Sequence, residues 1–297
     1  MDGIVTRNEP ETEWNEFEQA FYEVKDVTGR PNEPIAGAIN MVSCFGDNAA
    51  AAENPDLVAV DSEGRPATRD REYFDWDYIC PTHDAYREGL LEMIADCGAE
   101  HDDVRLDDVG FPRDDYCRCE RCERRFADSE FDDWRAWRAS VITEFVAAAR
   151  ERVPGRLYLT LYPDPYPDHL SARAGLDLDA LAPFVDEFVV PLYDLDYGTT
   201  YWLESLARGF RTALGGDYDP DDADPEPPFS IELYAVDVDV DNLIQAAEVA
   251  GHYGTTVFFG YEADQGWGEI RGRGAGQQEG ETYMHGGAWV GRVSNFV

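Results

Sequence analysis

The segments VRLDDVGF (residues 104–111), WRAWRASVITEF (residues 134–145) and LYLTLY (residues 157–162) decide the fold class of this 297-residue chain. The first and third are short runs rich in apolar residues, as strands are, whereas the second has its apolar residues at helical spacing. A strand, a helix and a second strand in this order predict one unit of a parallel sheet with a crossover helix.

The same alternation continues on both sides of this unit. It predicts strands at residues 3–7, 35–43, 188–193, 229–234 and 257–261, and helices within residues 14–24, 86–94, 203–210 and 243–247. An open doubly wound sheet would place a glycine-rich turn after its first strand, where this sequence reads Arg7-Asn8-Glu9-Pro10. The pattern therefore favours a (β/α)8 barrel of the TIM type, and we expect one domain over residues 1–297.

The charge is extreme, because 62 acidic residues stand against 24 basic ones and give a net charge of -38. Concentrated salt screens such self-repulsion, so the composition predicts a halophilic protein of a high-salt cytosol. A cationic partner is the alternative, but the acidic residues are spread along the chain rather than gathered in one tail. The same charge argues against nucleic acid and anionic membranes as partners.

The chain carries no sign of export or membrane insertion. No stretch approaches the roughly 20 apolar residues of a membrane span, and the first residues lack the pattern of a signal peptide. A cytoplasmic location is therefore expected.

Three cysteines lie within one hexapeptide, at Cys117, Cys119 and Cys122. Thiolates at this spacing suit a tetrahedral zinc ion, although a redox pair of Cys119 and Cys122 is an alternative. The candidates for a fourth ligand are Cys80, Cys97 and Cys44. Cys80 is favoured because it lies in an irregular segment, whereas the other two occupy positions typical of buried free thiols. Four cysteine ligands leave no open coordination position, so the zinc would be structural and would hold the loop of residues 80–122 together.

Three motifs follow one another in a characteristic order: CPTHDAYRE from Cys80, LDDVG from Leu106 and CRCERC from Cys117. Together with residues 54–65 they resemble glycoside hydrolase family 42, the zinc-bearing β-galactosidases, and related barrel glycosyl hydrolases. Over residues 54–126 the resemblance extends to specific sequence motifs, whereas elsewhere it concerns only the barrel architecture. It implies a retaining glycoside hydrolase that acts on a β-linked sugar or oligosaccharide, with a structural zinc and no organic cofactor.

The resemblance also implies the catalytic positions. In that family a Glu preceded by Asn ends the fourth strand and is the general acid/base; here Asp108 holds that position and Asp107 replaces the Asn. The family's nucleophile is a Glu at the end of the seventh strand, which Glu232 matches, and Glu262 is a reserve carboxylate. A retaining pair is expected about 5 to 5.5 Å apart. Because successive strand residues point to opposite faces, only one of the two aspartates should enter the barrel.

The resemblance further makes residues 3–7 the second strand and residues 35–43 the third. The first strand would then be missing. Either the chain as given starts late, or the barrel is incomplete and has an exposed edge.

Polar and aromatic residues follow the later strands, where barrels carry their chemistry. Aromatic faces there could stack on sugar rings, and carboxylates could bind sugar hydroxyls. The predicted substrate-binding residues are Asp107, Tyr162, Tyr193, Asp194, Tyr234, Tyr261 and Trp267.

Two other functions remain open at this point. A catalytically inactive carbohydrate-binding relative would keep the aromatics and the zinc while losing the acid, as the change at Asp107 and Asp108 suggests. Another hydrolase or an isomerase is the second alternative, but the five histidines lie off the strand ends where a catalytic metal would be held. The sequence also leaves the oligomeric state open, a homo-oligomer included.

Overall fold

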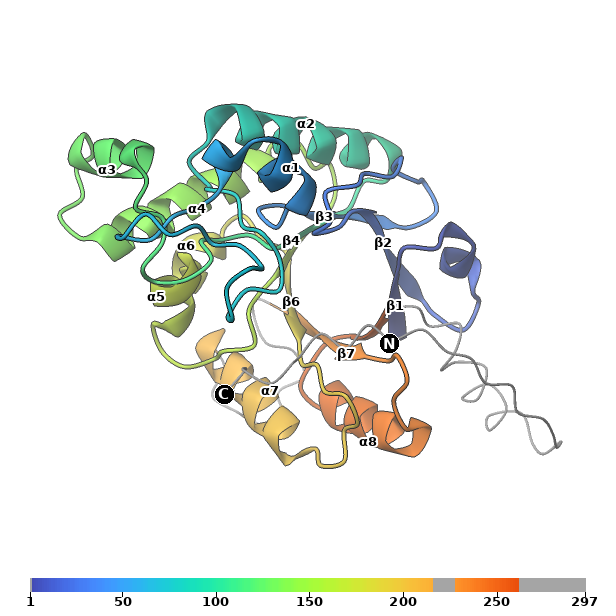
Figure 1. The fold of residues 1–297 in the computed structure, drawn as a ribbon. Coiled ribbons are helices and arrows are strands. Elements are labelled where there is room, and N and C mark those ends of the chain that lie inside the picture. The colour runs from blue at the N-terminus through green and yellow to red at the C-terminus, as the bar shows by residue number, and fades with distance from the viewer. Residues whose placement is uncertain (1, 216–227, 262–297) are drawn as a thin grey trace, which may run out of the picture.

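The computed structural model describes residues 2–215 and 228–261. Within these ranges eight parallel strands form a closed barrel in the order in which they occur in the chain, and Figure 1 looks along its axis. The strands are β1 (Asp2–Thr6), β2 (Gln19–Lys25), β3 (Ile39–Ser43), β4 (Val104–Asp107), β5 (Leu157–Thr160), β6 (Glu187–Pro191), β7 (Phe229–Tyr234) and β8 (Val257–Gly260). The predicted (β/α)8 barrel class is confirmed.

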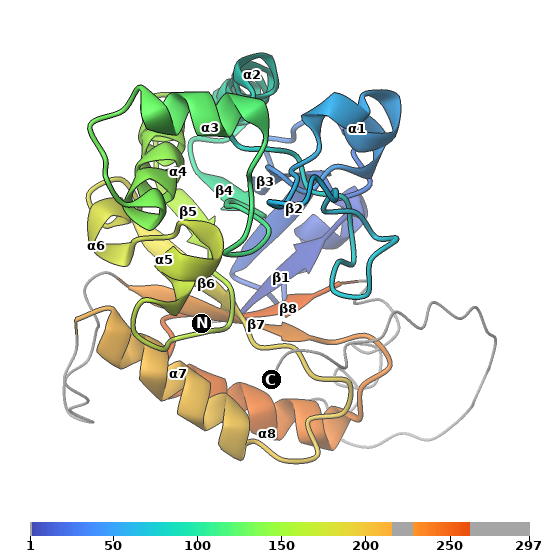
Figure 2. The ribbon, with the colours of Figure 1, turned by 60° about the vertical axis from the view of Figure 1, so that its left-hand side comes forward.

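The helices form the outer layer of the barrel. They are α1 (Asn48–Glu53), α2 (Asp84–Glu100), α3 (Glu120–Ala127), α4 (Trp134–Arg150), α5 (His169–Ala174), α6 (Leu178–Leu181), α7 (Tyr201–Ala213) and α8 (Val240–Gly251), with short 3-10 helices η1 (Glu9–Glu13) and η2 (Pro55–Leu57). Figure 2 shows α7 and α8 packed side by side next to β7, whereas α4 lies on the β4 and β5 side. Among the described residues, no helix combines the length and the apolar character that crossing a membrane requires.

Two predictions about the N-terminal part are wrong. The first strand is not missing: residues 3–6 of the strand expected at residues 3–7 belong to β1, which pairs with both β2 and β8 and so closes the barrel. The helix expected at residues 14–24 is instead β2, because residues 19–25 extend between β1 and β3 and bond to both. Between β1 and β2 the structure has η1 in place of a full crossover helix.

The alternation of side chains divides the core into two layers. Inside the barrel lies an apolar cluster of Val5, Phe21, Ile39, Met41, Tyr158, Val189 and Phe258. The ring of Phe21 anchors it, with centroids 4.3 Å from Phe258 and 5.2 Å from Tyr158. A larger outer cluster joins the other strand faces to the helices, for example Leu106 to α4. The inner cluster fills the barrel below its carboxyl end and leaves that end to polar side chains.

Candidate functional site

Alternation along β4 and β7 turns charged side chains into the barrel. In β4, Val104 and Leu106 belong to the outer cluster, so Arg105 and Asp107 face inward. In β7 the same reasoning turns Glu232 inward. Arg105 and Glu232 are both completely buried, and Arg105 Nη2 lies 2.5 Å from Glu232 Oε2. A fully buried ion pair therefore joins β4 and β7 inside the barrel, near the carboxyl ends of both strands.

Glu232 has a second partner in the hydroxyl of Tyr193, which donates a hydrogen bond to Oε1. The pKa of Glu232 is raised above its ordinary value, because burial outweighs the charge of Arg105 and the Tyr193 hydrogen bond, which both lower it. Gly260 on β8 leaves the space for this carboxylate, since a Cβ there would lie 2.9 Å from Glu232 Oε1. The carboxylate is thus held in one orientation from three sides.

Both aspartates that end β4 lie at the same opening. Asp107 Oδ2 is 3.8 Å from Arg105 Nη2, which places it toward Glu232. Asp108 follows the strand with a φ of 49°, and its Oδ2 accepts a hydrogen bond of 2.5 Å from Ser43 Oγ on β3. Asp108 lies after the end of β4 in a left-handed turn, so its side chain need not point away from that of Asp107. The expectation that only one of the two aspartates enters the barrel assumed that both lie in the strand.

Burial and the neighbouring Asp107 charge raise the pKa of Asp108 to about 7, whereas Ser43, Lys25 and Arg105 act in the opposite direction. An aspartate with this pKa is protonated for a large part of the time near neutral pH. It can therefore donate a proton, which an ordinary surface aspartate cannot do at that pH.

Sequence reasoning missed Glu23 as a member of this site. Glu23 points inward from β2, is 5% exposed, and forms an ion pair with Arg7 beyond the end of β1. Burial, together with the charges of Asp107 and Asp108, raises the pKa of Glu23 to about 8 despite the opposing charge of Arg7. The signal was the alternation in QAFYEVK (residues 19–25), which the helical interpretation of residues 14–24 concealed.

Four of the predicted aromatic residues lie around the opening. Tyr193 and Tyr234 lie together with ring centroids 5.9 Å apart, and Tyr193 is 36% exposed. Arg7 Cζ lies over the ring of Tyr261, 5.3 Å from the ring centroid. Burial raises the pKa of the Tyr261 hydroxyl, and the charges of Glu232 and Glu23 act in the same direction. Tyr162, with a pKa raised to about 12 chiefly by burial, lies on the Asp108 side.

One described residue of the predicted set, Asp194, does not join this arrangement. The carboxylate of Asp194 accepts the backbone N–H of Leu195 at 2.6 Å, so it shapes its own loop. Glu262 and Trp267 lie outside the described residues.

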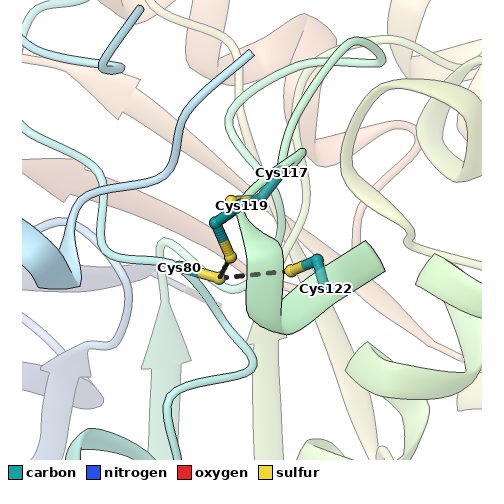
Figure 3. A group of neighbouring side chains, drawn as sticks. All are labelled: Cys80, Cys117, Cys119 and Cys122. Atoms are coloured by element: carbon teal, nitrogen blue, oxygen red, sulfur yellow. Dashed lines mark hydrogen bonds between the residues drawn. The ribbon is translucent and has the colours of Figure 1, made fainter. Parts of the chain in front are cut away.

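The four predicted cysteines come together at one point, as Figure 3 shows. Their sulfur atoms all lie within 4.8 Å of one another. Cys80 comes from the segment before α2, Cys117 and Cys119 precede α3, and Cys122 lies within it. The remaining cysteines, Cys44 and Cys97, are buried free thiols away from this cluster, as expected.

The sulfur geometry fits a tetrahedral metal ion. Cys80 Sγ lies 3.5 Å from Cys122 Sγ and 3.9 Å from Cys119 Sγ. A tetrahedral zinc with Zn–S bonds of about 2.3 Å requires S–S separations of about 3.8 Å, far longer than a disulfide bond. Four soft sulfur donors, three of them buried, therefore form a closed set that could hold one metal ion.

The cysteine cluster joins two loops that begin at neighbouring strands. The Cys80 loop follows β3, and the loop with the other three cysteines follows β4. Hydrogen bonds connect them at a second point, where Arg118 N donates to Val60 O at 2.7 Å and Val60 N donates to Cys117 Sγ at 3.4 Å. The cluster thus stabilises the part of the rim next to Ser43 and Asp108.

The similarity of this chain to known proteins is one of structure. No family model and no curated protein matches the sequence. The glycoside hydrolase domain of PgaB (BpsB) from Bordetella bronchiseptica is similar, with a TM-score of 0.65 and 12% identity over 88% of this chain and 94% of that chain. The alpha-L-fucosidase isoenzyme 2 from Paenibacillus thiaminolyticus has a TM-score of 0.58 and 13% identity over 88% of this chain and 45% of that chain. At such identities the likeness concerns the fold, and the chain has the eight-stranded barrel of these glycoside hydrolase-like proteins.

Proposed function

We propose that this chain is a retaining glycoside hydrolase that acts on a β-linked sugar or oligosaccharide. The observation that carries the proposal is the contrast between two carboxyl groups at one barrel opening. Asp108 has a pKa raised to about 7, whereas Glu232 is held by a buried arginine and a tyrosine. This reaction needs one carboxyl group that donates a proton and a second carboxylate that is held in position, so the two groups must have different surroundings. The structural likeness to glycoside hydrolase domains supports the same reaction class.

In this mechanism the Asp108 carboxyl group protonates the glycosidic oxygen while Glu232 attacks the anomeric carbon. The bond to the leaving group breaks, and a glycosyl ester forms on Glu232. Asp108, now ionised, takes a proton from water as the water attacks the anomeric carbon; the bond between that carbon and the Glu232 oxygen breaks, which releases the sugar and restores both groups. Arg105 and the Tyr193 hydroxyl orient Glu232 and favour its ionised form.

A non-catalytic carbohydrate-binding relative is the second candidate. It is favoured by the complete burial of Glu232 and by its pairing with Arg105, since a nucleophile must reach the sugar. In that case the partly exposed Tyr193 and its neighbour Tyr234 would serve as a surface on which a sugar ring stacks.

A covalent trap separates the two candidates. Incubation with activated 2-deoxy-2-fluoro β-glycosides in multimolar salt is expected to add one glycosyl mass to the intact protein, because the fluorine slows hydrolysis of the ester. The label should map to the peptide that contains Glu232 and be absent from Glu232→Gln. Binding of the parent sugars without any label would favour the carbohydrate-binding candidate, and a label on another carboxylate would reassign the nucleophile.

We further propose that the cysteine cluster holds a structural zinc and that the chain is related to glycoside hydrolase family 42. The four sulfur donors and their spacing support zinc, and the proximity of Cys80 to the other three supports the relation. All four coordination positions are taken by cysteine, so this ion would stabilise the rim without touching substrate.

The net charge of -38 supports a high-salt cytosol as the working environment. We expect the melting temperature to fall as potassium chloride is lowered from molar to millimolar concentration, because carboxylates then repel one another without screening. Thermal unfolding followed by circular dichroism checks this. A melting temperature independent of salt would contradict the halophilic proposal.

A further inference from the structure

Lys25 is the only lysine in the chain, and it is buried at the carboxyl end of β2 with 4% of its surface exposed. A lone lysine among 24 basic residues is unusual, and burying an ammonium group is costly unless its donors are satisfied. The mechanism described above does not use Lys25. Lys25 nevertheless contacts Ser43, which is hydrogen-bonded to Asp108, the residue proposed as the acid.

The Lys25 ammonium group has three acceptors within reach, as many as it has protons. Nζ donates to Ser43 O at 2.8 Å and to Gly46 O at 3.0 Å, and it lies 3.2 Å from Asp47 Oδ2. Asp47 is itself held by the Tyr86 hydroxyl at 2.8 Å and caps α1. Lys25 therefore ties together the turn formed by residues 43–47, where the chain leaves β3.

Ser43 connects this turn to Asp108. Its hydroxyl has one proton and two acceptors within reach, Asp108 Oδ2 at 2.5 Å and Gly46 O at 3.2 Å. The Asp108 oxygen is the nearer of the two acceptors, so we assign the Ser43 proton to Asp108. A hydrogen bond at Oδ2 leaves Oδ1 as the oxygen that carries the acidic proton.

We propose that Lys25 is a positioning residue for Asp108, which acts by fixing the turn of residues 43–47 so that Ser43 Oγ donates to Asp108 Oδ2. The compact ammonium group suits three acceptors that converge on one point, whereas the planar fork of an arginine does not. This accounts for a lysine at this position in a chain that otherwise uses arginine for all its strong bases.

Electrostatics act in the same direction as this geometry. The Ser43 hydrogen bond and the Lys25 charge each lower the pKa of Asp108 against burial and Asp107, which raise it. The titratable and charged groups that face Asp108 are Asp107, Arg105, Glu23, Lys25, Cys44, Tyr78, Tyr86 and Tyr162. Lys25 is the only one of these that contacts the Ser43 turn as a cation.

The experiment follows the carboxyl group of Asp108 directly and needs no catalytic activity. Protein labelled with ¹³C-aspartate is titrated by NMR in multimolar salt, and the Asp108 signal is assigned by its loss in Asp108→Asn. Lys25→Met is expected to raise the Asp108 midpoint by about 1 pH unit or more, because a nearby positive charge and a hydrogen bond are lost together. Ser43→Ala should raise it as well. In the double variant the shift should be smaller than the sum of the two, since Lys25 acts partly through Ser43.

Arg69→Met is the matched control. Arg69 is half exposed, and its charge pairs with Asp77 at 3.4 Å rather than with an acceptor of the 43–47 turn, so the midpoint should stay in place. Should Lys25→Met fold poorly because Asp47 loses its partner, Lys25→Met with Asp47→Asn removes both charges and is titrated instead. An unchanged Asp108 midpoint would overturn the proposal, and so would fully additive shifts, which would mean that Lys25 acts by charge alone. The titration needs no turnover, so a negative result overturns the positioning role of Lys25 without bearing on the hydrolase activity. Only the effect of this positioning on catalysis rests on the proposed function.

Discussion

An Asp108→Asn variant is expected to lose about 10²- to 10⁴-fold in kcat on a β-glycoside with a poor leaving group, because the amide cannot donate a proton to the glycosidic oxygen. A dinitrophenyl leaving group needs no such proton, so the loss in the bond-breaking step should be much smaller with that substrate. Steady-state and burst kinetics on the two substrates measure the difference. Asp56→Asn, which alters an exposed aspartate in η2, is the control and should keep full activity.

The pH profile gives the same prediction a second readout. Since the pKa of Asp108 is raised to about 7, the donating form is present below that pH, and the rate should fall as pH rises through about 7. The Asn variant should lack this alkaline limb. If the limb persists in Asp108→Asn, the acid is another group, and Glu23, whose pKa is raised to about 8, would be the next residue to replace.

Protein stability distinguishes a catalytic loss from unfolding. The folded-state pKa of Asp108 is above its ordinary value, so folding favours the protonated form, and wild-type stability is lost as pH rises toward and through about 7. A neutral asparagine avoids the buried charge. We therefore expect Asp108→Asn to melt no lower than the wild type at pH 8, as thermal unfolding would measure.

Loss of the metal centre should have the largest effect on stability. We expect one zinc per chain by elemental analysis of the wild type, and none in Cys80→Ser or Cys122→Ser. Removing a ligand frees the loops after β3 and β4 from each other. The expected cost is about 3 kcal/mol or more, a fall in melting temperature of about 5 °C or more for a chain of this length.

Cys97→Ser is the control for this prediction, because Cys97 is also completely buried but lies in α2 away from the cluster. It should retain its zinc and show the smaller loss typical of one altered buried side chain. A wild-type protein that contains no metal, or a Cys122→Ser variant that keeps its full complement, would contradict the assignment.

The cysteine site shows how far local spacing determines a structure. Cys117, Cys119 and Cys122 are close in the sequence, so any compact turn brings their sulfur atoms near one another. Cys80 was identified as the fourth member from its irregular surroundings, and the fold places its sulfur 3.5 Å from that of Cys122. Here the sequence was sufficient because few arrangements of the chain satisfy four such ligands.

Segment 19–25 shows the opposite case. Its apolar residues, together with Trp14 and Phe17, fit helical spacing, but the same seven residues also alternate as a strand. Hydrogen bonds to β1 and β3 decide between the two, and apolar spacing within the segment does not reveal them. The error removed one strand from the prediction and made the barrel seem open.

By itself, then, the sequence determined the barrel class, the order of the later strands and the four cysteines, because apolar periodicity and ligand spacing are local properties. Only the tertiary structure decided which polar groups share the opening. Glu23, Lys25, Ser43 and Arg105 come from three different strands, and the pKa of Asp108 depends on burial and on charges that those strands bring together. No local pattern encodes this arrangement, since it exists only once the barrel is closed.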